Sequence, residues 1–257
     1  MKTMNRNQFQ QLKCNHTAVL LLNLTVFQAV AEDQVSEDEA TVRQRSVMHN
    51  FIQRQDKTNA MMAFEELSKE IKDVNYMLRT LRNWGEFQKC QEYFDQLQDL
   101  GLKPDVATYS LMLSIYAKER NVKRADEIWQ TAQDDESIEI DRILYNSYIQ
   151  VHLATEAFDK ALALIEEMKS KDLEPDLVTY NTLISGFGKN DRNLNRSARV
   201  VDQLLGDMKA KGLELDYNTY IALAKMSLSA GVVSKAARFV QEMGKKNIKI
   251  PSFHCSR

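Results

Sequence analysis

The chain has 257 residues, of which 44% are hydrophobic and 27% are charged, and its formal net charge is −2. These proportions are typical of a folded globular protein. The sequence holds only 8 glycines and 3 prolines, which leaves little room for turns and favours an all-helical fold. Its three cysteines, Cys14, Cys90 and Cys255, lack the paired spacing of a disulfide framework or a cysteine-rich zinc site. We therefore expect no metal and no other cofactor.

Residues 1–31 are predicted to be a targeting segment. They carry three basic residues and no acidic residue, which leaves a net charge of −5 for the rest of the chain. The apolar run at residues 18–27 is shorter than the roughly 20 residues of a membrane-spanning helix, so no stable span is expected. The ending Ala29-Val30-Ala31 resembles a secretory cleavage site, whereas the acid-free start suits an organellar transit peptide. A first, partly buried helix is the alternative.

Residues 32–70 are predicted to form a degenerate helical pair. Apolar residues between Val42 and Ile52 fit one amphipathic helix, and those between Ala60 and Leu67 fit a second. The pair lacks the opening phrase of the segments that follow it. An end repeat that departs from the pattern is expected of a helical-repeat protein, because it has only one neighbour.

One phrase recurs through the rest of the chain, most clearly as Glu-Pro-Asp-Leu-Val-Thr-Tyr-Asn-Thr-Leu-Ile at residues 174–184. Its tyrosine returns at positions 109, 145, 180 and 220, in steps of 36, 35 and 40. Two further ladders share this spacing: Leu97, Ala132, Met168, Met208 and Met243, and Cys90, Ala125, Ala161, Val201 and Ala236. A period of this size predicts a solenoid of stacked repeats.

Five repeats, each with two amphipathic helices, are expected after the degenerate pair. In the first, Val74, Met77, Leu78 and Leu81 lie at the i, i+3, i+4 and i+7 positions of one helical face. The longer fourth repeat carries five extra residues in the polar stretch 190–196. The predicted boundaries are 71–105, 106–141, 142–176, 177–216 and 217–251, with residues 252–257 as a C-terminal remnant.

An aspartate stands just before four of the first helices, at positions 105, 141, 176 and 216. One interpretation is helix capping, because an aspartate at a helix N-terminus satisfies free backbone N–H groups and favours the helix dipole. Such a cap is worth about 0.5–2 kcal/mol.

The phrase Pro-Asp-x-Val-Thr-Tyr-Asn-Thr-Leu-Ile at residues 175–184, the period of 35 and the later Glu166-Glu167-Met168-Lys169 resemble the pentatricopeptide repeat family. The resemblance covers roughly residues 71–251. It implies an all-α, right-handed α-solenoid of stacked helix-turn-helix pentatricopeptide repeats. It also implies binding of single-stranded RNA, with one base for each repeat.

In this family the fifth and the last residue of a repeat face the edge of one base. Carried over, the resemblance implies the pairs Asn75 with Asp105, Ser110 with Asp141, Asn146 with Asp176, and Asn181 with Asp216. An asparagine amide can donate to and accept from a base edge, and the aspartate can help to exclude the wrong base. Asparagine with aspartate implies uracil over cytosine, and serine with aspartate implies guanine, so the implied site is 5′-UGUU-3′. Ile221 and Pro251 of the fifth repeat depart from this pattern, and we expect no readout there.

Other family roles fall on two further sets of residues. The resemblance assigns the sandwiching of bases to the second position of each repeat, where Ala107, Ile143 and Val178 suit apolar packing and Lys72 and Asn218 suit it less. Basic residues late in the first helices are candidates for phosphate contacts: Arg82, Lys118 and Lys189. The alternative for these three is a solvated helix end favoured by the helix dipole.

Two functions follow from the sequence. The first is an RNA-binding protein of a chloroplast or mitochondrion, acting in transcript processing, stabilisation or translation. The second is a protein-binding scaffold, such as a subunit of an organellar ribonucleoprotein or ribosome, because an acidic solenoid suits basic partners. A positive groove would favour the first. An enzyme is not expected, since the sequence has no phosphate-binding loop and no zinc deaminase signature.

Overall fold

The computed structural model describes residues 37–67, 70–97, 99–190 and 194–248. Over these residues the secondary structure is twelve α-helices without a strand, which confirms the all-helical prediction. The chain divides into two compact units, Met1–Lys69 and Glu70–Arg257. The predicted targeting segment and C-terminal remnant lie outside the described residues. No described helix is both long enough and apolar enough to cross a membrane.

The first unit contains two helices, α3 (Glu37–Gln53) and α4 (Lys57–Glu65), that pack against each other. Asp56 is the N-cap of α4, since its carboxylate accepts a hydrogen bond from a backbone N–H of the first turn at 3.2 Å. The side chains buried in this unit include Met48, Ala60, Phe64 and Leu67. An apolar stripe on each helix therefore holds the pair together.

The second unit contains five helical pairs. The first helices of the pairs are α5 (Ile71–Trp84), α7 (Val106–Glu119), α9 (Arg142–Ala154), α11 (Leu177–Asn190) and α13 (Tyr217–Ser229). The second helices are α6 (Phe87–Asp95), α8 (Val122–Asp134), α10 (Phe158–Ser170), α12 (Leu194–Ala210) and α14 (Val233–Lys245).

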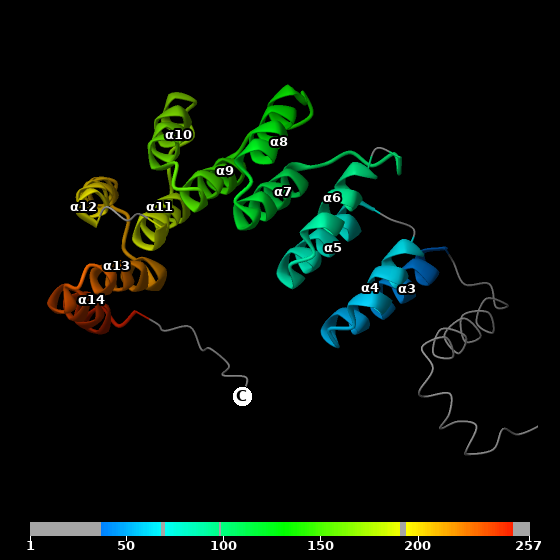
Figure 1. The fold of residues 1–257 in the computed structure, drawn as a ribbon, viewed down its shortest axis with the longest axis horizontal. Helices are drawn as coiled ribbons and strands as arrows, with labels where there is room; N and C mark the ends of the chain where they lie inside the picture. Colours follow the sequence, from blue (N-terminus) through cyan, green and yellow to red (C-terminus); the bar gives the residue numbers. More distant parts are fainter. Residues whose placement is uncertain (1–36, 68–69, 98, 191–193, 249–257) are drawn as a thin grey trace, which may run out of the picture. The chain divides into compact units, whose positions relative to one another are not determined.

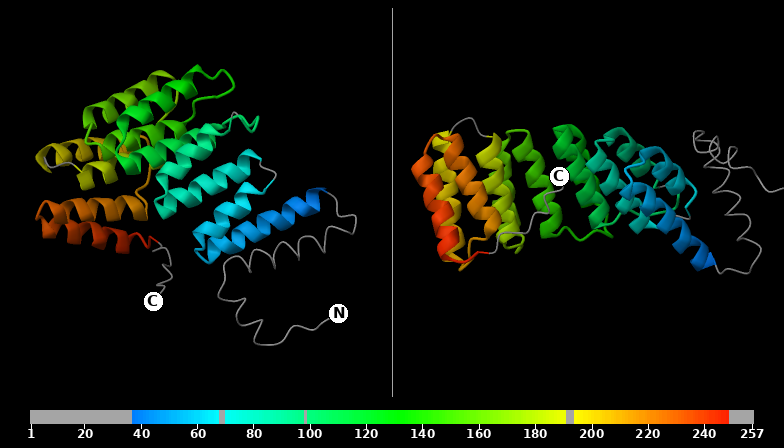
Figure 2. Two further views of the ribbon diagram at one scale, coloured as in Figure 1. Left: turned by 45° about the vertical axis from the view of Figure 1, so that its right-hand side comes forward. Right: turned by 90° about the horizontal axis from the view of Figure 1, so that it is seen from below.

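The first helices of this unit form a continuous layer, because α5 packs on α7, α7 on α9, α9 on α11, and α11 on α13 (Figures 1 and 2). Each second helix packs on the first helix of its own pair. A two-helix unit cannot bury both of its apolar stripes alone, so stacking supplies the core. This arrangement is the predicted α-solenoid.

The three sequence ladders form that core. The tyrosine ladder is at most 3% exposed at positions 109, 145, 180 and 220, and the small residues at positions 90, 125, 161, 201 and 236 are at most 4% exposed. Small side chains at the second ladder let the two helices of a pair approach closely. The third ladder, from Leu97 to Met243, is buried as well. Three rows of buried residues, one for each ladder, explain why the period is visible in the sequence.

The second helices are joined to one another by ion pairs. Lys160 of α10 lies 3.4 Å from Asp126 of α8, and Arg196 of α12 donates to Asp159 of α10 at 2.5 Å. Lys235 of α14 likewise lies 3.7 Å from an aspartate of α12. These side chains are partly or largely exposed, so each pair contributes on the order of 0–1 kcal/mol.

The longer fourth repeat is accommodated in its second helix. Helix α12 has 17 residues, whereas α8, α10 and α14 each have 13. Helix α11 still packs on both α9 and α13, so the layer of first helices continues through this repeat. Residues 191–193, in the middle of the predicted insertion, lie outside the described residues.

Candidate nucleic-acid interface

The four aspartates singled out in the sequence are all at helix N-termini. The Oδ1 atoms of Asp105, Asp141, Asp176 and Asp216 accept hydrogen bonds from the backbone N–H three residues later, at 2.7, 2.8, 3.0 and 2.8 Å. Each N-cap residue is extended, with φ between −92° and −107° where α7, α9 and α13 begin. Capping fixes each carboxylate at the start of a first helix, beside the first helix of the preceding repeat.

At the junction of the first two repeats, one capping aspartate also contacts the predicted base-reading asparagine. Asn75 of α5 donates its Nδ2–H to Asp105 Oδ1 at 3.0 Å, and its Oδ1 lies 2.8 Å from the hydroxyl of Thr108. That hydroxyl also lies 2.7 Å from Asp105 Oδ1. Asparagine, aspartate and threonine therefore form a closed network across two repeats.

The same network recurs 106 residues later, where the fourth repeat meets the fifth. Asn181 of α11 donates to Asp216 Oδ1 at 3.1 Å, and its Oδ1 lies 2.5 Å from the hydroxyl of Thr219. The Thr219 hydroxyl lies 2.7 Å from the same carboxylate oxygen. The same three residue types therefore form the same network at two junctions of the solenoid.

Both networked aspartates are held in the ionised form. Partial burial of Asp105 works to raise its pKa, but the hydrogen bonds from Thr108 and Asn75 together lower it below its ordinary value. At Asp216, partial burial likewise works to raise the pKa, and hydrogen bonds from Thr219 and Asn181 lower it below its ordinary value. An ionised carboxylate only accepts, so the asparagine must present its NH₂ group to it.

The other two predicted pairs are not joined. No hydrogen bond links Ser110 to Asp141 or Asn146 to Asp176, although each aspartate caps its helix. Ser110 Oγ and Asn146 Oδ1 are buried and lack a hydrogen-bond partner among the described residues. A buried polar atom without a partner is uncommon in a folded protein, so these two junctions differ from the networked ones.

The second positions of all five repeats are exposed. Ile143 is 63% exposed and Val178 is 60% exposed, and Ala107 is exposed as well. Most of the surface of these two apolar residues therefore faces solvent. They lie one turn or less from the asparagine or serine of their own repeat, as a residue that packs against a base would need to.

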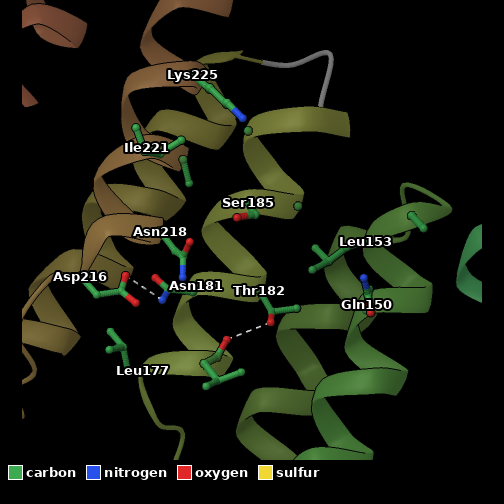
Figure 3. Close-up of a pocket in the computed structure, with 15 residues that line it drawn as sticks. Gln150, Leu153, Leu177, Asn181, Thr182, Ser185, Asp216, Asn218, Ile221 and Lys225 are labelled. Carbon is green, nitrogen blue, oxygen red and sulfur yellow. Dashed lines mark hydrogen bonds between the residues drawn. The ribbon is translucent and has the colours of Figure 1, made fainter. Parts of the chain in front are cut away.

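A groove of about 550 Å³ runs over α9, α11 and α13. Figure 3 shows Asn181 and Asp216 meeting in it from neighbouring first helices, with Asn218, Ser185 and Lys225 nearby. Val178 lines the same groove. The network at this junction therefore lines an open groove.

Two models of known repeats match the chain. The one described as a pentatricopeptide repeat domain matches residues 93–136 and 203–253, and the one described as the PPR repeat family matches residues 140–189. The chain belongs to the pentatricopeptide repeat family.

Several curated relatives of this pentatricopeptide repeat chain are proteins of Arabidopsis thaliana. Two that are named chloroplastic pentatricopeptide repeat-containing proteins are 34% and 30% identical, over 46% and 77% of this chain and 17% and 24% of their own lengths. One named mitochondrial is 23% identical over 74% of this chain and 45% of its own length. The chain thus spans less than half of each of these relatives.

Two solved structures share the fold. The maize pentatricopeptide repeat protein PPR10 in complex with an 18-nucleotide psaJ RNA element has a TM-score of 0.69 at 22% identity, over 85% of this chain and 32% of that chain. The pentatricopeptide repeat domain of Arabidopsis thaliana protein-only RNase P 1, in complex with tRNA, has a TM-score of 0.50 at 14% identity, over 69% and 90%. These likenesses confirm the fold class.

The predicted phosphate contacts have partners inside the pentatricopeptide repeat unit. Arg82 of α5 donates to the hydroxyl of Ser114 on α7 at 2.8 Å, and Lys118 of α7 donates to the backbone carbonyl of Arg82 at 3.4 Å. These bonds join two adjacent first helices. The side chain of Lys189 lies outside the described residues. A phosphate role for the three remains a prediction, and Arg82 would have to leave Ser114 to fulfil it.

The ninth residue of each repeat was not included among the candidate site residues predicted from the sequence. Arg79, Gln150 and Lys225 occupy it in the first, third and fifth repeats, and all three are exposed. Gln150 and Lys225 line the groove with Ser185, the ninth residue of the fourth repeat. The ninth residue follows the fifth by four, which places both on one helical face. That spacing was the available signal.

Charge is divided unequally between the two layers. The first helices contain seven basic and two acidic residues, whereas the second helices contain eleven of each sign. The other acidic residues of the first layer are the N-caps, namely Glu70 and the four aspartates. With these caps the first layer carries seven residues of each sign, so its excess of basic residues is confined to the helices beyond their capped N-termini. The part of the chain that the structure describes brings no three metal-binding side chains together.

Proposed function

We propose that this pentatricopeptide repeat chain binds single-stranded RNA in a chloroplast or mitochondrion and acts in transcript processing, stabilisation or translation. It works as a binder rather than a catalyst. Each of the first four repeats receives one base between the second-position side chains and reads it with its fifth and last residues, giving the site 5′-UGUU-3′.

The observation that carries this proposal is the pairing of Asn75 with Asp105 and of Asn181 with Asp216. In each pair the amide of a repeat's fifth residue meets the carboxylate of the same repeat's last residue, which caps the next first helix. After these internal bonds the amide keeps one N–H and one lone pair, which match the edge of a pyrimidine. An aspartate acting only as a cap would not need this partner.

Three further features support the proposal. Exposed Ile143 and Val178 offer apolar faces on which bases can pack. Basic side chains on the first helices, such as Lys225 in the groove, suit a phosphate backbone. The fold is that of a protein whose structure contains an 18-nucleotide RNA element, and curated relatives are named chloroplastic or mitochondrial.

Equilibrium binding tests the proposal directly. The full chain is titrated with a labelled RNA carrying UGUU, a scrambled RNA of the same composition and the matching DNA, at two salt concentrations. We expect a preference for UGUU RNA that survives moderate salt. Weak binding that vanishes with salt regardless of sequence would overturn the proposal and favour a scaffold that binds protein.

Asn181 gives the proposal a site-specific test. We expect Asn181→Ala to weaken uracil binding at the fourth base by about fivefold or more, the effect of losing a hydrogen bond, without unfolding the chain. Affinities for UGUU and for UGUA, together with a melting curve, check this. A large fall in melting temperature with unchanged base preference would instead give Asn181 a purely structural role.

A further inference from the structure

We infer that Thr108 and Thr219 are positioning residues that lock the amides of Asn75 and Asn181 in one orientation. The preference for uracil over cytosine is therefore stronger at the first and fourth bases than at the third. This inference rests on the proposed function. It concerns residues at the third position of the following repeat, which the pairing of fifth and last residues leaves out.

The lock follows from the bonds around each threonine hydroxyl. Asp216 Oδ1 already accepts from the Thr219 backbone N–H and from Asn181 Nδ2. The single hydroxyl proton of Thr219 has two acceptors within reach, Asn181 Oδ1 at 2.5 Å and Asp216 Oδ1 at 2.7 Å, and we assign it to the nearer amide oxygen. Thr219 is fully buried, so water does not compete for that proton. The amide is held at both ends, NH₂ to carboxylate and oxygen to hydroxyl.

Amide orientation matters because uracil and cytosine present opposite patterns. Uracil offers an acceptor at O4 beside a donor at N3, whereas cytosine offers a donor at N4 beside an acceptor at N3. An asparagine facing that edge pairs with uracil in one orientation and with cytosine after a half-turn of the amide. A free amide serves both bases, and a locked amide serves one.

The third repeat supplies the natural contrast. Thr179 is as buried as Thr219, and its backbone N–H and its hydroxyl each lie 3.0 Å from Oδ1 of the capping Asp176. It makes no hydrogen bond to the asparagine of its junction, and Asn146 Oδ1 has no partner among the described residues. The second junction has Leu144 in place of a threonine. Among the four junctions that the structure describes, the first and the fourth carry the lock.

The test compares Thr219→Val with Thr179→Val in the full chain. Both changes remove a buried hydroxyl from a helix N-terminus while keeping the shape of the side chain. Affinities are measured for UGUU, UGCU and UGUC. In the wild type we expect the fourth base to discriminate against cytosine about fivefold more than the third. Thr219→Val should abolish that difference, Thr179→Val should change the third-base ratio less than twofold, and Thr219→Ser should restore the wild-type ratio.

NMR of the chain without RNA tests the threonine lock independently of RNA binding. The side-chain NH₂ resonances of Asn181 should shift in Thr219→Val, and those of Asn146 should not shift in Thr179→Val. A wild-type chain with no uracil preference at any base would overturn the proposed function and the inference with it. A wild-type preference at the fourth base that survives Thr219→Val, or unmoved Asn181 resonances, would overturn the inference alone.

Discussion

In the repeat unit the first helices stack on one another, whereas the second helices pack mainly on their own partners and are joined by partly exposed ion pairs. The first layer buries polar groups at its junctions and leaves a groove open. The second layer keeps its charges balanced and in water. The first layer should therefore be sensitive to small changes of shape and protonation, and the second should tolerate them.

The largest expected effect is the loss of stability when a methyl group is added at a glycine of the first layer, and a glycine of the second layer serves as the control. A Cβ at Gly186 of α11 would lie 2.6 Å from Cδ1 and 2.8 Å from Cβ of Leu153 on α9, closer than atoms can approach. Because Leu153 is buried, the two helices must separate, and we expect Gly186→Ala to lower the free energy of unfolding by roughly 2–3 kcal/mol. Urea unfolding measures this change.

Gly206 of α12 is the matched control in the second layer. A Cβ there meets no atom within 4 Å, so Gly206→Ala should stabilise the chain by about 0.5–1 kcal/mol through helix propensity. Changes of the same sign in the free energy of unfolding at both positions would contradict the expected difference between the layers. A destabilised Gly186→Ala should also lose RNA affinity, because Gly186 and Leu153 line the groove.

The next effect concerns a buried histidine in the first layer. His152 of α9 is fully buried, and neither ring nitrogen has a hydrogen-bond partner among the described residues. Burial lowers its pKa to about 4, helped by Lys160 and opposed by Asp126, whose carboxylate also accepts from Tyr148. Between pH 6.5 and 4 the unfolded chain binds the proton that the folded chain excludes, so stability falls as the pH falls.

We expect this histidine to reduce the free energy of unfolding by about 2 kcal/mol between pH 7 and pH 5. Urea unfolding at the two pH values measures the change in the wild type and in His152→Phe. The phenylalanine ring can keep the edge contact with Tyr148 and does not titrate. An equal pH dependence in His152→Phe would assign the effect to other groups.

The fold was predictable from the sequence because burial in a solenoid repeats with the chain. Tyr145 and Tyr180 occupy equivalent sites, so the same apolar residue type recurs at the same step. The capping role of Asp105 was also predictable, since a cap depends only on residues three apart. Local rules of this kind are written in short stretches of sequence.

The junction networks were not predictable in the same way. Asn146 and Asn181 stand at equivalent positions, and both are followed by an aspartate and a threonine at the expected spacing. Of these two, Asn181 bonds to its aspartate and Asn146 does not. Such a bond joins residues 30 or more positions apart, so it depends on the packing between helices and not on a local rule. The repeat pattern placed the right residues at each junction, and packing decided which junctions closed.

The smallest expected effect is the loss of RNA affinity when one lysine is neutralised, compared between the two layers. Lys225 lies on a first helix and lines the groove, whereas Lys235 lies on α14 of the second layer beside Asp202. If RNA follows the first layer, Lys225→Gln should weaken binding about threefold and reduce the salt dependence by about one phosphate contact. Lys235→Gln removes the same charge from the same repeat and should leave both quantities unchanged. Binding isotherms over a range of salt concentrations give both values, and equal losses in the two variants would mean that RNA is attracted by overall charge rather than by the groove.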